Sequence, residues 1–126
     1  MNNQKHTILL VEDEPFTKKL VSHSLTTNGF VVIEAKNGQE ALEKCKQTLP
    51  DLIISDVMMP VLDGLELRKK LLHNDRLNAI PFIFLSARAQ THEVIQGEKM
   101  RPDIYITKPI EPGELIEAIK ELLHID

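Results

Sequence analysis

The chain has 126 residues, of which 42% are hydrophobic and 27% are charged, and its formal net charge is −4. A chain of this length builds one hydrophobic core, so we expect a single domain over residues 1–126. The acidic balance argues against direct binding of nucleic acid, and no apolar run is long enough for a membrane span or a signal sequence. The single cysteine, Cys45, excludes an internal disulfide and fits a reducing compartment, so we expect a cytoplasmic protein.

Five short apolar runs predict buried strands, which lie at residues 8–11, 30–33, 52–54, 82–85 and 104–107. The segments that follow them carry apolar residues at helical spacing. The first such segment opens with Pro15, which suits the first turn of a helix, counts Phe16 among its apolar positions, and ends at Asn28-Gly29.

Capping residues indicate where two further helices begin. Asn37, with Glu40 three residues later, predicts one start, and Asp63 predicts another. The helix after Asp63 carries Arg68-Lys69-Lys70, which we expect to form a solvated face. Residues 91–99 predict the weakest helix because only two of them are strongly apolar, and Glu111-Pro112 opens the last one.

This alternation of strands and helices predicts an α/β fold, a doubly wound five-stranded parallel sheet flanked by five helices. Parallel strands share one direction, so their C-terminal ends meet at a single edge of the sheet. Ligand sites of open α/β sheets lie at that edge. The polar residues that follow the strands, and that we therefore expect to converge there, are Glu12, Asp13, Asp56, Ser86 and Lys108.

These residue types suggest a phosphoryl-accepting site. Three neighbouring carboxylates, from Glu12, Asp13 and Asp56, repel one another unless a cation lies between them, and such oxygen ligands suit Mg²⁺. Lys108 offers a compact positive charge and Ser86 a hydroxyl donor, both suited to phosphoryl oxygens. Asp56 is the predicted nucleophile and Asp13 the main metal ligand.

Four motifs resemble the receiver domains of two-component response regulators. They span essentially the whole chain and are Val11-Glu12-Asp13-Glu14, Asp56-Val57-Met58-Met59-Pro60 with Asp63-Gly64, Ser86-Ala87, and Lys108-Pro109. The resemblance implies a flavodoxin-like fold with strand order 2-1-3-4-5. It also implies that Asp56 receives a phosphoryl group from a phosphohistidine of a sensor histidine kinase or phosphotransfer protein.

The resemblance assigns further roles at this site. The backbone carbonyl of Met58 would complete the shell of a bound Mg²⁺ or Mn²⁺, with Glu12 helping through a water molecule. The backbone of Ala87 would bind the phosphoryl group together with Ser86 and Lys108. The peptide bond before Pro109 would be cis, a conformation found almost only before proline.

The resemblance also implies a switch. Ser86 would move toward the new phosphoryl oxygens while Tyr105 turns inward, which remodels the surface of the fourth helix, fifth strand and fifth helix. An ordinary half-buried strand aromatic would fit Tyr105 equally well. The output would be a downstream effector protein or an absent C-terminal output domain, and family members can dimerise on phosphorylation. No enzyme activity is expected beyond the domain's own phosphoryl transfer and slow autodephosphorylation.

Two departures from the family pattern and three alternatives accompany this interpretation. Ser86 replaces the commoner threonine, and the turn before Tyr105 reads Arg101-Pro102-Asp103-Ile104 instead of a glycine-containing acidic turn. A phosphatase with an aspartate nucleophile would have a second aspartate where Met58 stands. A flavin- or nucleotide-binding module would have a glycine-rich loop in place of the acidic residues 12–14. A receiver that only docks onto a partner, without phosphorylation, is the third alternative.

Overall fold

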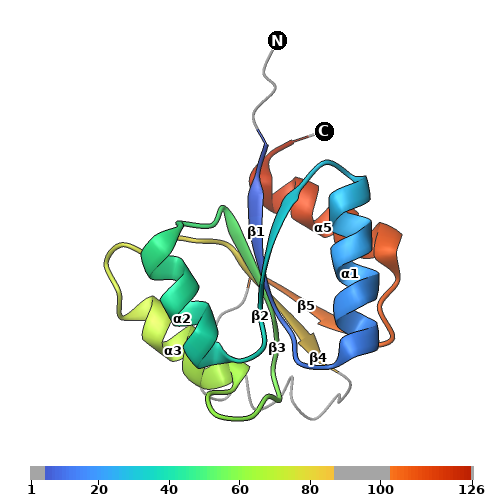
Figure 1. Cartoon of the computed structure of the whole chain (residues 1–126). Coiled ribbons are helices and arrows are strands. Elements are labelled where there is room, and N and C mark those ends of the chain that lie inside the picture. The colour runs from blue at the N-terminus through green and yellow to red at the C-terminus, as the bar shows by residue number, and fades with distance from the viewer. Residues whose placement is uncertain (1–4, 87–102, 126) are drawn as a thin grey trace.

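The computed structural model describes residues 5–86 and 103–125, which form one parallel sheet with helices on both of its faces (Figure 1). The strand order is β2-β1-β3-β4-β5, and every neighbouring pair is parallel. The strands are β1 (Thr7–Val11), β2 (Val31–Ala35), β3 (Leu52–Asp56), β4 (Phe82–Ser86) and β5 (Ile104–Thr107). The predicted α/β fold and its strand order are confirmed.

In the described part of the chain, two helices cover each face of the sheet. Figure 1 shows α1 (Pro15–Thr27) and α5 (Pro112–Leu123) on one face and α2 (Gly38–Gln47) and α3 (Gly64–Leu72) on the other. The helix predicted at residues 91–99 lies outside the described residues. Of the five predicted helices, the described part of the chain therefore contains four.

Side-chain caps begin the four helices. Asn37 accepts a hydrogen bond from the Glu40 amide at 2.9 Å, and Asp63 accepts one from the Glu66 amide at 2.9 Å, as their spacing predicted. The caps of α1 and α5 are glutamates, Glu14 and Glu111, each followed by a proline. The carboxylate of each glutamate accepts hydrogen bonds from two amides of the first helical turn.

The core is divided by the sheet into two apolar layers. Because side chains alternate along a strand, Ile8 and Leu10 of β1 face α1 and α5, whereas Leu9 and Val11 face α2 and α3. The central strands β1, β3 and β4 are buried on both faces, which is why their sequences read as continuous apolar runs. Cys45 is buried in the second layer, and burial raises the pKa of its thiol.

Two side chains differ from the sequence-based expectation. Phe16, predicted to lie on the apolar face of its helix, is 73% exposed, because it belongs to the first turn of α1 at the end of the sheet. Arg68, predicted to be solvated, is buried, and its guanidinium lies 4.9 Å from the centre of the Phe82 ring. Burial lowers the pKa of Arg68, and the negative charge of Asp103 opposes that shift.

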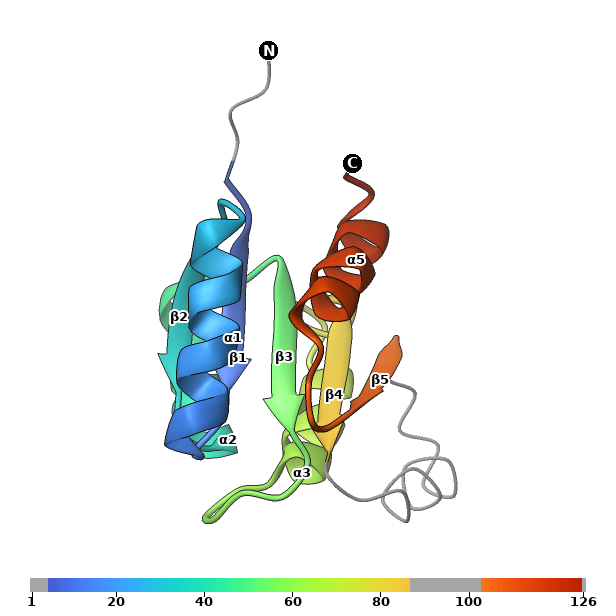
Figure 2. The ribbon, with the colours of Figure 1, turned by 90° about the vertical axis from the view of Figure 1, so that its right-hand side faces the viewer.

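The parallel strands run toward one edge of the sheet, whereas the start of β1 and the end of α5 lie at the opposite edge (Figure 2). The loops after β1 and β3 therefore lie away from the start of β1 and the end of α5. Among the helices of residues 5–86 and 103–125, none is long and apolar enough to cross a membrane.

Candidate functional site

The predicted site residues gather at the C-terminal edge of the three central strands and β5. Val11 pairs with Ser55 across β1 and β3, so the next residues in line, Glu12 and Asp56, leave the sheet side by side. On the other side of β3, Asp56 pairs with Leu85 of β4. Parallel pairing thus brings residues far apart in sequence to one point, as expected for a ligand site of this fold.

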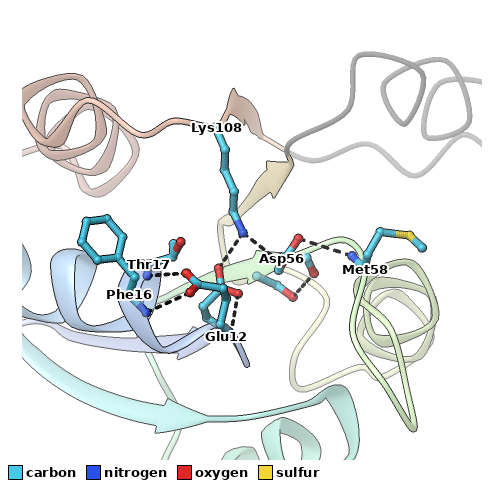
Figure 3. A network of polar contacts seen from close by, with 8 residues as sticks. Glu12, Phe16, Thr17, Asp56, Met58 and Lys108 are labelled. Carbon is cyan, nitrogen blue, oxygen red and sulfur yellow. Dashed lines mark hydrogen bonds and ion pairs between the residues drawn. The ribbon is translucent and has the colours of Figure 1, made fainter.

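Lys108 joins the two buried acids. Its Nζ atom lies 3.0 Å from Oε1 of Glu12 and 3.0 Å from Oδ2 of Asp56, and it donates a hydrogen bond to each carboxylate (Figure 3). The backbone directs this side chain, because the Lys108 amide donates to the Ser86 carbonyl at 2.7 Å just beyond the β4–β5 pairing. Charge-assisted bonds of this kind are among the strongest polar contacts in proteins.

Burial shapes the electrostatics of this group. Glu12 is 0% exposed, and its burial raises the pKa of its carboxyl to about 6. The Lys108 bond partly counters that rise and the charge of Asp56 adds to it. For Lys108 itself, burial would lower the pKa, but the bonds to Asp56 and Glu12 outweigh burial and raise it. Lys108 therefore keeps its positive charge while it donates hydrogen bonds to both carboxylates.

Glu12, Asp13 and Asp56 form the one cluster of potential metal ligands found in the described residues. Each offers a carboxylate oxygen, and these oxygens lie within 4.8 Å of one another. The Asp13 side chain is exposed, whereas Glu12 and Asp56 are buried. Hard oxygen donors at this spacing fit Mg²⁺, which commonly takes one or two carboxylates and keeps several waters. The residues present thus suit the cation that the sequence predicted.

The segment after β3 folds back closely over the end of that strand. The Met58 amide donates to Oδ1 of Asp56 at 3.3 Å, and the Gly64 amide donates to the Val57 carbonyl at 2.9 Å. A Cβ atom on Gly64 would lie 2.2 Å from the Asp56 carbonyl oxygen, so no other residue fits there without displacing the backbone. The sequence predicted only a turn at Asp63-Gly64. In the structure, Gly64 also allows the loop to pack directly against the backbone at the end of β3.

The remaining predicted residues lie in or next to β4 and β5, or outside the described residues. Ser86 is buried at the end of β4, and Tyr105 is half-buried and packs against the layer under α2 and α3. The Lys108–Pro109 peptide bond is cis, as the resemblance implied. Ala87 and the Arg101-Pro102 part of the unusual turn lie outside the described residues. Asp103 is described, and its carboxylate accepts a hydrogen bond from the Phe82 amide at 2.7 Å.

Sequence reasoning did not foresee two features of the site. Glu12 was expected to act on a metal through water, and the structure also pairs it directly with Lys108. Glu14 belonged to a predicted motif but had no predicted role of its own, and in the structure it caps α1 beside the site. The proline that follows Glu14 was the available signal, because proline in the first helical turn places the cap one residue before it.

The sequence matches the response regulator receiver domain family over residues 8–120. With this match, the sheet order and the acidic site, the chain belongs to the receiver domains of two-component response regulators.

Individual relatives are consistent with this membership. The chain is 40% identical over 121 residues to the probable transcriptional regulator ycf29 of Porphyra purpurea, which covers 96% of this chain and 58% of that protein. The chain spans about half the length of the curated relatives it matches. A crystal structure of a putative response regulator from Chloroflexus aurantiacus superposes with a TM-score of 0.89 at 31% identity, over 96% of this chain and 99% of that one.

A further solved structure with a similar fold contains a metal ion. It is the receiver domain of a sensor histidine kinase from Pseudomonas aeruginosa, with a magnesium ion coordinated in its active-site cleft. Its TM-score is 0.87 at 25% identity, and the match covers 96% of this chain and 99% of that one.

Proposed function

We propose that this domain accepts a phosphoryl group on Asp56 and thereby controls an output partner. The observation that carries the proposal is the contact of one ammonium, Lys108, with both Asp56 and Glu12 at 3.0 Å, beside a cluster of three carboxylates. This arrangement holds a nucleophilic carboxylate next to a positive charge that can bind phosphoryl oxygens.

The transfer step follows from the chemistry of a carboxylate nucleophile. An oxygen of Asp56 forms a bond to phosphorus while the bond from phosphorus to the imidazole nitrogen of the donor histidine breaks. The electron pair of the broken bond remains on the imidazole, which then takes up a proton. Lys108 already bonds to Asp56, so its ammonium can bind the incoming phosphoryl oxygens with a small rotation of its side chain.

Magnesium is the cofactor we propose. Asp13, Asp56 and the Met58 carbonyl would bind it directly, and Glu12 would do so through water. When bound, the ion supplies positive charge that offsets the repulsion between phosphoryl oxygens and these carboxylates. Support comes from the three clustered oxygen donors here and from the magnesium ion in the similar Pseudomonas aeruginosa receiver.

The proposed partners are a phosphohistidine donor and an effector. The donor is a sensor histidine kinase or a phosphotransfer protein. Several relatives are named transcriptional regulators and are about twice as long as the region they share with this chain, so the effector is a separate protein or a further domain. Movement of Ser86 and Tyr105 would transmit the change to the surface around β5 and α5, where phosphorylation could also favour a homodimer.

Beyond its own phosphorylation and slow autodephosphorylation, we propose no enzyme activity. A phosphatase of the aspartate-nucleophile class would need a general acid where Met58 stands, and the Met58 side chain is apolar and 59% exposed. A receiver that only docks remains the second candidate. It is distinguished by failing to take up a phosphoryl group.

Intact mass tests the proposal. The wild-type protein is incubated with acetyl phosphate, with and without Mg²⁺, beside Asp56→Asn and the exposed control Asp75→Asn. We expect a gain of one phosphoryl group that requires Mg²⁺, persists in the control and disappears in Asp56→Asn. The absence of any gain under all conditions would favour the docking receiver, and rapid release of phosphate without accumulation of a phosphorylated protein would favour a phosphatase.

A further inference from the structure

The loop between β3 and α3 contacts the first residue of α2. The amide of Gly38 donates a hydrogen bond to the carbonyl of Leu62 at 2.8 Å. A Cβ atom on Gly38 would lie 2.7 Å from that carbonyl oxygen and 3.0 Å from two carbons of the Leu62 side chain. Neither φ nor helix propensity requires glycine here, since Gly38 is the first helical residue and its φ is not left-handed. The close approach to Leu62 requires it.

The same loop contains a strained turn. Val61 has a φ of 68°, a left-handed value that is unfavourable for a β-branched residue. The Leu62 amide donates to the Pro60 carbonyl at 2.8 Å, which closes a three-residue turn of the rare γ type. The Val61 side chain is 80% exposed, so burial of that side chain does not stabilise the turn. Contacts on either side of Val61 must hold it.

Two glycines make those contacts. Gly38 holds the Leu62 carbonyl, and Gly64 holds the end of the loop through its hydrogen bond to the Val57 carbonyl. The start of the loop is tied to the acceptor, because the Met58 amide donates to Asp56. A displacement at Leu62 therefore cannot be absorbed at the far end of the loop and is passed back toward Met58.

We propose that Gly38 is a positioning residue for the metal site. Its contact with Leu62 holds the strained loop in the shape that keeps Met58 beside Asp56, and so sets the affinity of the site for divalent cations. This inference rests on the proposed function, because Met58 and Asp56 are the residues expected to bind magnesium. It goes further by assigning a role at the site to a residue of α2, an element that contributes no ligand.

The test compares Mg²⁺ affinity in Gly38→Ala and Gly113→Ala. Gly113 is a matched control, since it lies at the start of α5 and an added Cβ would meet only the movable carboxylate of Glu111, at 3.2 Å. Affinity is measured by titrating Mg²⁺ while following backbone amide resonances near Asp56. We expect Gly38→Ala to weaken binding about tenfold and Gly113→Ala to leave it unchanged.

A double variant separates positioning from packing. Val61→Gly relaxes the turn, so that in Gly38→Ala/Val61→Gly the Leu62 carbonyl can move without displacing Met58. We expect this second substitution to restore most of the lost affinity. If Gly38 only packs α2 against the loop, relaxing the turn leaves the affinity of Gly38→Ala where it was.

Hydrogen exchange of the wild-type protein gives a measurement that needs no variant. Because coupling between two sites is reciprocal, Mg²⁺ should slow exchange of the Gly38 amide more than that of the Gly113 amide. Equal affinity in the two alanine variants, or no added protection of Gly38, would overturn the inference while leaving phosphorylation of Asp56 intact. A wild-type protein that neither binds Mg²⁺ nor gains a phosphoryl group would overturn the proposed function, and this inference with it.

Discussion

Lys108 Nζ lies 3.0 Å from Oδ2 of Asp56, a residue 52 positions away in the sequence, and it also reaches Glu12, 96 positions away. One ammonium thus serves two buried carboxylates that would otherwise face each other. The proposed acceptor site contains a structural ion pair before any ligand binds. Its charges therefore influence the stability of the fold as well as the chemistry.

Removal of the ammonium should destabilise the protein. Lys108→Met removes the ammonium that donates to both Glu12 and Asp56, and we expect the free energy of unfolding to fall by about 1–3 kcal/mol without divalent cations. Mg²⁺ should recover more stability in this variant than in the wild type. Urea denaturation with and without Mg²⁺ measures both effects, with the exposed Lys19→Met as control. Equal losses in the two variants would contradict the structural role of Lys108.

The buried Glu12 should make stability depend on pH in the metal-free protein. Its folded pKa of about 6 lies above the ordinary value of 4.5, so the folded state binds the proton more tightly than the unfolded state. The stabilisation from this group is then complete below pH 4.5 and is lost as the pH rises through about 6. A shift of this size corresponds to about 2 kcal/mol.

Glu12→Gln isolates this effect, because the amide has a similar shape and does not titrate. Relative to the wild type, we expect the variant's free energy of unfolding to rise by about 2 kcal/mol between acidic and neutral pH. Urea denaturation across this range in the presence of a chelator provides the measurement. Parallel pH profiles for the two proteins would show that Glu12 titrates normally in the folded state.

Asp13 should affect metal binding far more than stability. It is exposed and it neighbours the two buried acids, so Asp13→Asn should change the free energy of unfolding of the metal-free protein by less than about 0.5 kcal/mol. Wild-type protein should gain about 1.4 kcal/mol at a Mg²⁺ concentration roughly ten times its dissociation constant. The variant should lose most of that gain. Thermal melts with and without Mg²⁺ test this, and a full Mg²⁺ response in Asp13→Asn would exclude Asp13 as a ligand.

A glycine in the left-handed turn at position 61 should stabilise the protein. Val61→Gly removes the Cβ that makes φ of 68° unfavourable, and it sacrifices little buried surface. We expect the free energy of unfolding to rise by about 0.5–1 kcal/mol, since relief of the turn exceeds the added flexibility of the unfolded chain. Val61→Ala keeps the Cβ and should gain less. A loss of stability in Val61→Gly would mean that the turn is not strained.

Local sequence signals predicted the helix caps and came within one residue of the start of β2, because these features depend on residues that are close together in the chain. The caps at Asn37 and Asp63 were predicted because a capping side chain bonds to an amide only three residues later. The second strand was predicted to start at Phe30, and it begins one residue later. The Phe30 amide donates to the Leu25 carbonyl and closes the end of α1, so pairing with β1 starts only at Val31.

Exposure was harder to predict, because it depends on where an element ends relative to the sheet. Phe16 has the spacing of a core residue, but its turn of α1 lies at the edge of the sheet and leaves the ring exposed. Arg68 reads as a surface residue, but the Phe82 ring provides a surface that can receive a buried guanidinium. The spacing of residues within one helix does not show which strand or helix will pack against it, so it cannot predict the exposure of these two side chains.

The sequence by itself determined the order of the elements and the residues that end each strand, because hydrophobic runs, caps and turns are properties of short segments. It therefore predicted the fold and the acidic edge of the sheet. Only the tertiary structure decided how those residues meet: that Lys108 bonds to both Glu12 and Asp56, and that α2 reaches the loop after β3 through Gly38. Such contacts join segments far apart in the chain, and their distances follow from packing of the whole sheet and its helices.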